Sequence, residues 1–570
     1  MSDGPFVVGK STKALFSLKV HRGKGMALLA MNWKKGKPPL DFVGFAIEYK
    51  EPGDDKFQAV SNRLSFDSPD GKPKKSSSRV APIQKWRWVH FPHDSHSEGE
   101  YHYRITPVFM NDRDELSYGD PQEASIALGS ETVAGKLDVN FTRGFISSQA
   151  FVDTYAKNDK DMSALLPAKA DQGWNFKPTN PKAQEAYTWM GFEAWRVMLQ
   201  LLDEAIADKK AQVCMVAYDF NHPEVAEKLS KLGKRLRVII DDSPPHPDKG
   251  SSENHIADLL KKSAGADNVK RQHMGQLQHN KTLVINGPKV KAALCGSTNF
   301  AWRGLFVQNN HAVVVRGAKA IQPFVDAFEQ YWASNNPADF GDSPSTKWND
   351  LGLTGVKAKV TFSPHSTDRQ VLPELADDIA NKATSSVLYS LAFLGMTHGA
   401  LRDAITKVTE GNKLFVYGIA DKKVGGINLQ KTDGNIAPVN PQALTGKDVP
   451  EPFKSEPTGG FGTRMHHKFV VIDFDKPTAR VYFGSNNMSI TADLKNGENL
   501  VLVQDRRVAT AFMIEALRIF DHYEFRIAAT KTKIGKLFLA KPPRKKGEKP
   551  WWDKDYTLKH RIRDRELFSK

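Results

Sequence analysis

The stretch Met465-His466-His467-Lys468-Phe469-Val470-Val471-Ile472-Asp473, followed by Val481-Tyr482-Phe483-Gly484-Ser485-Asn486-Asn487, determines how the chain is interpreted. The apolar run 469–472 predicts a short buried strand. Because residues two apart on a strand share a face, His466 and Lys468 are expected to point into one site. The second run ends at Gly484, which allows a tight turn into small polar residues. Their hydroxyl, amide and backbone N–H groups suit an anion.

An earlier stretch has the same order of residues. Positions 278–286 are Gln-His-Asn-Lys-Thr-Leu-Val-Ile-Asn, and positions 291–299 are Lys-Ala-Ala-Leu-Cys-Gly-Ser-Thr-Asn. An amide or acid follows each copy, in Gln308-Asn309-Asn310 and in Gly497-Glu498-Asn499. A single His-x-Lys is usually a solvated surface pair. Two copies with matched flanks indicate an internal duplication whose halves build one site.

At these residues the chain resembles the phospholipase D superfamily, which is defined by paired His-x-Lys-x4-Asp motifs with a following Gly-Ser-x-Asn. The resemblance extends over about residues 139–530, and only the two motif regions are specific. The second motif matches in full, whereas Asn286 stands where the family usually has Asp. The resemblance implies two α/β repeats that meet about a pseudo-twofold axis, with the site at their seam.

The resemblance also implies a chemistry that passes through a covalent phosphohistidine. His279 is the expected nucleophile and His466 the expected acid and base, although the sequence alone does not order the two. Lys281 and Lys468 are expected to neutralise the phosphate. The residues expected to donate further hydrogen bonds to it are Ser297, Asn299, Ser485 and Asn487.

Orienting groups are predicted as well. An Asp usually holds a catalytic His in the right tautomer, and Asp473 is expected to do so across the seam. Asn286 can form a hydrogen bond but cannot compensate charge, so the imidazole that it supports should be less basic. Gln308 and Glu498 complete the predicted supporting set.

No metal and no cofactor is expected in this scheme. The sequence has no compact cluster of His, Asp and Glu with metal-ligand spacing. Asp241, Asp242 and His246 are assigned to a loop after a strand. His467 is adjacent to His466 but on the other face of the strand, so we expect it to pack or be exposed rather than to react.

Composition sets wider bounds. The 570 residues are too many for one ordinary core, and two to four domains are expected. The balance of 81 Lys and Arg against 65 Asp and Glu gives a net charge of +16. This charge favours phosphate-rich partners, namely nucleic acid, an anionic membrane surface or an anionic small substrate, without choosing among them. Cys214 and Cys295 lie in apolar runs and are expected to be free thiols.

Neither a secretory signal nor a transmembrane run is visible in the sequence. The expected location is therefore cytoplasmic, and export without a cleaved signal would leave no trace.

The first 130 residues predict a β-sandwich. Short, partly alternating runs are separated by Gly, Pro, Asp and Ser; they are 28–33, 42–49, 56–60, 86–91, 101–110 and 124–128. Trp33 in an early strand and the segment 101–105 resemble a fibronectin type III-like domain. A basic hairpin loop is expected at 67–79 and a linker at 131–138.

The rest of the chain predicts an α/β layer architecture with a parallel or mixed sheet, as two phospholipase D-like repeats at 139–345 and 356–570. Predicted helices are 181–209, 223–232, 254–263, 319–334, 372–382, 400–408 and 508–527, and predicted strands are 212–220, 236–240, 360–363, 386–394 and 413–418. The segment 422–463 is expected to form a loop over the mouth of the active site. The basic tail 541–570 is expected to dock on the body through its aromatic residues, with polyanion binding as the alternative.

Three functions remain open at this stage. The first is a phospholipase D-type phosphodiesterase that acts on a phospholipid head group, with water or an alcohol as acceptor. The second is a metal-independent nuclease of the same superfamily that acts on DNA or RNA, for which the charge is an argument. The third is an inactive anion-binding protein, supported only by Asn286.

Overall fold

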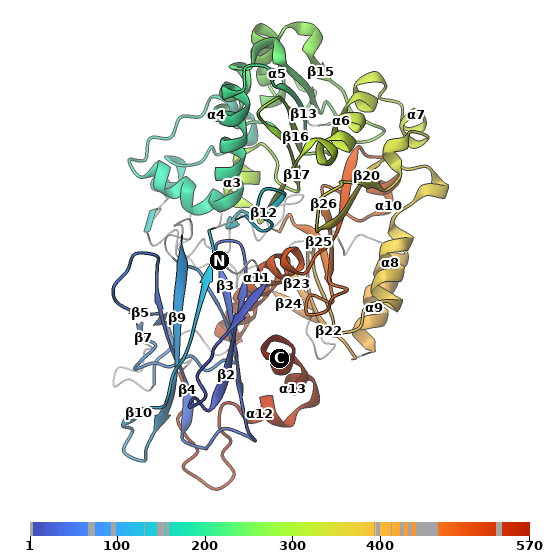
Figure 1. The fold of residues 1–570 in the computed structure, drawn as a ribbon. Helices are drawn as coiled ribbons and strands as arrows, with labels where there is room; N and C mark the ends of the chain where they lie inside the picture. The colour runs from blue at the N-terminus through green and yellow to red at the C-terminus, as the bar shows by residue number, and fades with distance from the viewer. Residues whose placement is uncertain are drawn as a thin grey trace.

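The computed structural model describes residues 4–66, 75–92, 99–129, 131–144, 154–155, 159–244, 246–392, 394, 399–411, 413–421, 427–430, 436–439, 465–531 and 538–570. Figure 1 shows three groups of elements. The N-terminal strands are blue, the first α/β half is mostly green, and the second half runs from yellow to red.

Residues 6–127 form two antiparallel sheets that share one hydrophobic core. The orders are β1-β2-β3-β8 and β10-β9-β4-β5, and β11 also pairs with β9. The strands are β1 (Phe6–Val8), β2 (Phe16–Arg22), β3 (Ala27–Trp33), β4 (Phe42–Lys50), β5 (Gln58–Ala59), β8 (Arg87–His90), β9 (Glu100–Met110), β10 (Leu116–Tyr118) and β11 (Gln122–Ala127). A separate pair is β6 (Ser61–Asn62) with β7 (Ser76–Ser77). Phe16 and Phe45, from different sheets, place their ring centroids 5.0 Å apart in this core. The fibronectin type III-like assignment stays a prediction.

Strand β2 was not predicted from the sequence, because polar residues interrupt its apolar pattern. Lys19 and His21 are nevertheless buried. The carbonyl of Phe568 lies 2.7 Å from His21 Nε2, and the carbonyl of Lys570 accepts a hydrogen bond from Lys19. The burial of these polar groups depends on the far end of the chain, which a local pattern cannot reveal.

The first α/β half contains a seven-stranded mixed sheet with the order β12-β18-β17-β16-β13-β14-β15. Its strands are β12 (Leu137–Phe141), β13 (Gln212–Ala217), β14 (Leu236–Ile240), β15 (Val269–Arg271), β16 (Thr282–Asn286), β17 (Lys291–Gly296) and β18 (His311–Arg316). Its helices are α2 (Asp159–Ser163), α3 (Ala183–Ala207), α4 (Pro223–Ser230), α5 (Ser252–Ala264), α6 (Ala318–Ala333) and α7 (Pro337–Gly341). The predicted alternation of strands and helices is confirmed. Strand β12 begins at Leu137, at the end of the predicted linker 131–138, and pairs with β18.

The second half is a nine-stranded mixed sheet with the order β19-β20-β27-β26-β25-β21-β22-β23-β24. Its strands are β19 (Asn349–Asp350), β20 (Lys357–Ser363), β21 (Ser386–Leu391), β22 (Phe415–Asp421), β23 (Ile427–Gln430), β24 (Ile436–Val439), β25 (Lys468–Ile472), β26 (Arg480–Gly484) and β27 (Glu498–Gln504). Its helices are α8 (Leu372–Asn381), α9 (Ala400–Glu410), α10 (Ile490–Leu494) and α11 (Arg506–Lys531). The predicted loop 422–463 therefore contains two strands, and its other residues lie outside the described part, as does most of the loop at 67–79.

The basic tail folds back on the N-terminal sheets through α12 (Asp553–Thr557) and α13 (Lys559–Ser569), near the lower edge of Figure 1. The ring planes of Trp551 and Trp86 are stacked with centroids 5.5 Å apart, and Trp552 belongs to the N-terminal core. Many tail cations pair with acids, as in Lys541–Asp114, Arg544–Asp112, Arg561–Asp555, Arg563–Asp564 and Lys570–Glu566. The predicted docking is confirmed, and the pairing weakens the case for a polyanion-binding tail.

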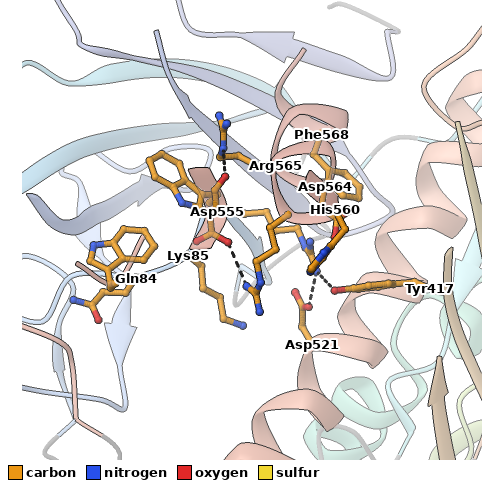
Figure 2. Close-up of a pocket in the computed structure, with 13 residues that line it drawn as sticks. Gln84, Lys85, Tyr417, Asp521, Asp555, His560, Asp564, Arg565 and Phe568 are labelled. Carbon is orange, nitrogen blue, oxygen red and sulfur yellow. Dashed lines mark hydrogen bonds and ion pairs between the residues drawn. The ribbon is translucent and has the colours of Figure 1, made fainter. Parts of the chain in front are cut away.

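A cavity of about 330 Å³ lies where the tail, the N-terminal sheets and the second half meet (Figure 2). Lys85, Asp521 and His560 are among the residues that line it, and none of the predicted site residues does. Both cysteines are free thiols, as predicted. Within the described ranges, no helix is long and apolar enough to cross a membrane.

Candidate active site

The two motifs meet where the two sheets face each other. His279 precedes β16, and His466 precedes β25. Isolated parallel bridges join Gln278 to Gly497 and Asn309 to Met465, so the residue before each histidine is tied to the other half. The centroids of the two imidazoles lie 6.4 Å apart, with ring planes at 71°. The prediction that the two histidines come together in one site is therefore confirmed.

The two motif lysines lie in the same buried space. Lys281 and Lys468 are both 0% exposed, and each ammonium donates a hydrogen bond to the carbonyl of the histidine two residues earlier. Burial lowers the pKa of Lys281 to about 8, against the opposing effect of Glu498 and other acids. At neutral pH this ammonium is still mostly charged, which suits an anionic substrate.

His279 has a carboxylate partner from the other half of the molecule. Its Nδ1 lies 2.8 Å from both oxygens of Glu498, which is 0% exposed. Burial lowers the pKa of His279, and the Glu498 carboxylate opposes that shift. Glu498 was predicted as a supporting residue, and the structure makes it the direct partner of His279.

His466 has an amide partner instead. Its Nδ1 lies 2.8 Å from Asn310 Oδ1 and 3.1 Å from the carbonyl of Ser297. Burial and the nearby positive charge of Lys468 hold the pKa of His466 well below its ordinary value. Since an amide carries no charge, the imidazolium of His466 is less stabilised than that of His279.

Asp473 does not orient a catalytic histidine, which corrects the prediction. Its carboxylate accepts hydrogen bonds from the backbone N–H groups of Thr384, Ser385 and Ser386, at 2.8–3.2 Å. A strand advances about 3.3 Å per residue, so Asp473 and His466 lie at opposite ends of β25. The buried aspartate instead anchors the loop that precedes β21.

Asn286 is also remote from the chemistry. It is exposed at the far end of β16, where its Oδ1 accepts a hydrogen bond from Lys291 Nζ at 3.0 Å. The prediction that it makes an imidazole less basic is therefore wrong for this residue. The uncharged amide that contacts a motif imidazole is instead Asn310, the partner of His466.

The spacing of the motifs contained the signal for Asn310. It follows Ser297 by the same thirteen positions by which Glu498 follows Ser485. Gln308, the predicted supporting residue, is two positions too early. The carbonyl of Gln308 accepts a hydrogen bond from Thr142 Oγ1 at 2.6 Å, so its backbone braces β12.

The predicted phosphate-binding residues fall into two groups. Ser297 and Ser485 are fully buried and bonded to protein partners: Ser297 Oγ donates to Asn310 Oδ1 at 2.8 Å, and Ser485 Oγ accepts from the backbone N–H of Asn499 at 2.9 Å. We assign these serines to positioning. Asn299 Nδ2 donates one hydrogen to Asp219 at 2.8 Å, and a phosphate-binding role for its other hydrogen stays a prediction. For Asn487 a phosphate-binding role stays a prediction.

Asp219, His246 and Glu253 place one candidate metal-ligand atom each within 4.8 Å of one another, which corrects the expectation that no compact cluster exists. The three come from separate segments, so no sequence spacing reveals them. His246 is bonded to carboxylates at both ring nitrogens, to Asp241 at 2.8 Å and to Asp219 at 3.0 Å. Burial lowers its pKa, but these two carboxylates outweigh burial and raise it to about 10. The imidazolium thus already supplies a positive charge to the cluster.

This cluster adjoins His279. The ring of Tyr218 lies 4.7 Å, centroid to centroid, from both His246 and His279. The backbone N–H of Gln278 donates to Asp241 Oδ1. Asp219, Tyr218 and Asp241 were not predicted as site residues, and their place beside His279 comes from β13, which pairs with β16 on one side and with β14 on the other.

Residues 198–332 match the family profile described as cardiolipin synthase, PLD-like domain. Among solved structures, the phosphatidylserine synthase of Haemophilus influenzae Rd KW20 is similar with a TM-score of 0.40 and 13% identity, over 57% of this chain and 84% of that one. The phospholipase D family member Nuc of Salmonella typhimurium has a TM-score of 0.20 and 20% identity, over 25% of this chain and 88% of that one. No curated protein matches the sequence.

Proposed function

Since the chain belongs to the phospholipase D superfamily, we propose that it is a phosphodiesterase that cleaves a phospholipid head group through a covalent phosphohistidine at His279. The observation that carries the proposal is the pair of buried imidazoles 6.4 Å apart, between two buried lysines. Each imidazole is held through Nδ1, which leaves its Nε2 for chemistry.

The reaction has two steps. His279 Nε2 attacks phosphorus, the bond from phosphorus to the leaving oxygen breaks, and His466 gives that oxygen its proton. Water then gives a proton to His466 and attacks phosphorus, and the phosphorus–nitrogen bond breaks to restore His279. Lys281 and Lys468 neutralise the non-bridging oxygens in both steps. An alcohol in place of water would give transfer instead of hydrolysis.

The partners of the histidines support this order of roles. An imidazole that bonds to phosphorus becomes positively charged, and the Glu498 carboxylate at Nδ1 of His279 stabilises that charge. Burial and Lys468 lower the pKa of His466, which has only a neutral amide as its side-chain partner, so its protonated form is a stronger acid than an ordinary imidazolium. An anionic substrate beside His466 favours that protonated form.

We also infer that residues 139–345 and 356–570 are two repeats about a pseudo-twofold axis. Matching positions in the two halves make matching contacts: Glu498 holds His279 as Asn310 holds His466. The retention of both His-x-Lys pairs in one buried site argues against an inactive anion-binding protein.

The alternative is a nuclease of the same superfamily, favoured by the net charge of +16. The purified protein, assayed on labelled phospholipid vesicles and on single- and double-stranded DNA and RNA, with and without excess chelator, separates the two. We expect lipid cleavage that survives the chelator. Cleavage of nucleic acid with a binding affinity that falls steeply with salt would establish the nuclease instead. A complete loss with chelator, restored by a divalent ion, would rule out the mechanism.

A further inference from the structure

A chain of buried, hydrogen-bonded side chains leads from His466 to helix α11. Asn310 Oδ1 lies 2.8 Å from both His466 Nδ1 and Ser297 Oγ, His311 Nδ1 lies 3.2 Å from Ser297 Oγ and 3.3 Å from His467 Nδ1, and His467 Nε2 lies 2.9 Å from Glu515 Oε1. All these side chains are at most 5% exposed. The reaction described above gives no role to His311, His467 or Glu515.

The positions of the hydrogens in this hydrogen-bonded network can be assigned by starting from Glu515 on helix α11. Glu515 is paired with Arg518, whose Nε lies 2.7 Å from Oε2, so the carboxylate is charged and only accepts. His467 must then carry its hydrogen on Nε2. Burial lowers the pKa of His467, so the ring is neutral and its Nδ1 is an acceptor. The contact between the two Nδ1 atoms therefore requires a hydrogen on His311 Nδ1.

The same constraint reaches the catalytic histidine. Ser297 Oγ receives a hydrogen bond from the backbone N–H of His311 at 3.1 Å, and its own hydrogen points to Asn310 Oδ1. Asn310 Nδ2 donates to the carbonyl of Gly304 at 2.8 Å, which fixes the orientation of the amide. Asn310 thus presents only an acceptor to His466, whose Nδ1 carries the hydrogen and whose Nε2 is left for the reaction.

Around His279, different residues occupy the positions that correspond to His467 and His311. There Asn499 Nδ2 lies 2.9 Å from Asn280 Oδ1 and 3.1 Å from Ser485 Oγ. Asn280 matches His467, and Asn499 matches His311, by position after the catalytic histidine and the serine. Two asparagines therefore suffice for packing at this place. The histidine pair with its carboxylate occurs on the side where the catalytic histidine has only an amide partner.

We propose that Glu515, acting through His467 and His311, is a positioning residue that holds Asn310 and Ser297 in the arrangement that orients His466, whose Nδ1 hydrogen the carbonyl of Ser297 also accepts. The role of His466 as acid and base rests on the proposed function, whereas the hydrogen positions do not. Glu515 does not touch the substrate; its effect passes through the hydrogen bonds of the four side chains between it and His466.

The variant Glu515→Gln tests this in the full-length protein. A glutamine amide can donate to His467 Nε2, which would move the hydrogen of His467 to Nδ1 and set two donors against each other at His311. We expect kcat for a substrate with an alcohol leaving group to fall by about 10–100-fold, the size typical of an orienting partner, with KM unchanged. The first-step burst with a 4-nitrophenyl phosphodiester should stay within about twofold, because that leaving group needs no proton.

A second variant guards against a simple loss of folding. His311→Asn with His467→Asn copies the Asn499–Asn280 pair, so it should pack while cutting the link to Glu515. We expect the same substrate-dependent defect. Glu193→Gln is the matched control, because Glu193 is an equally buried carboxylate, ion-paired with Arg196 at 3.3 Å and outside the site. It should show no difference between the two substrates.

Nitrogen NMR of histidine-labelled protein gives a readout that needs no turnover. We expect wild-type His467 to be protonated at Nε2, and Glu515→Gln to move that proton to Nδ1. Equal losses on both substrates, wild-type rates in the double variant, or an unchanged tautomer of His467 would each overturn the proposal. If wild type cleaves neither substrate while the tautomers behave as expected, the proposed function fails and the hydrogen-bonded network stands.

Discussion

The two histidine sides of the site share a backbone plan and differ in charge. Each histidine donates through Nδ1 to a side chain thirteen positions after the serine of the other half. That side chain is Glu498 for His279 and Asn310 for His466. The comparison shows that a symmetric motif can produce an asymmetric site, because the charge difference lies in partners outside the His-x-Lys repeats.

The largest expected effect comes from removing each histidine. His279→Ala should form no covalent intermediate with any substrate. His466→Ala should lose about 10²–10⁴ in rate on the natural substrate, the usual worth of acid–base assistance. It should still attack an activated aryl phosphodiester and then stall, because no base activates water. Intact-mass analysis after a quench should find the adduct in His466→Ala and not in His279→Ala.

The same measurement can also contradict the assignment of the two roles. An adduct on His466 in the His279→Ala protein would exchange the two roles. The absence of an adduct from both variants, under conditions where wild type turns over, would indicate direct attack by water.

A smaller effect is expected from equalising the two partners. Glu498→Gln gives both histidines an amide and removes the charge that stabilises the phosphohistidine. We expect kcat to fall by about 10–100-fold. Rapid-quench kinetics should assign the loss to the first step, with little change in KM. A loss confined to KM would show that Glu498 serves binding instead.

The pH profile of the reaction tests the partner of His466. His466 must be protonated for the first step, and its pKa is lowered mainly by burial, so activity is lost as pH rises through that pKa. Asn310→Asp places a carboxylate beside the imidazolium and raises the pKa, typically by about 1–3 units. The alkaline limb of kcat/KM should therefore move upward. An unchanged limb would mean that another group controls it.

How far the sequence predicted this site depends on whether the signal was local. The paired histidines and lysines, and the α/β order around them, follow from strand alternation and repetition, which act over a few residues. The N-terminal strand β2 and the Glu515 network depend on contacts between distant segments, and no local pattern contains them. Asn310 is an intermediate case, because its spacing from Ser297 was available but the expectation favoured Gln308.

The two motif positions that end each His-x-Lys strand illustrate a different failure. Asp473 and Asn286 were predicted from family resemblance to influence catalysis. Both stand at the far end of their strands, and Asp473 binds three backbone N–H groups there. A pattern over nine residues records that two positions occur together, but a strand holds its two ends too far apart for direct contact.

The smallest expected effect follows from this geometry. Asn286→Asp places the family residue at an exposed position, where the side chain of Asn286 contacts Lys291. The new carboxylate would form a surface ion pair, worth about 0–1 kcal/mol. We expect kcat/KM to stay within about twofold and the melting temperature to change little, as measured by steady-state kinetics and thermal unfolding. Asp473→Asn is the contrasting variant: it weakens a buried acceptor of several N–H groups, so stability should fall while the pH profile of the remaining activity stays the same. A strong rate increase in Asn286→Asp would contradict this prediction and would show that the residue at this strand end influences the reaction.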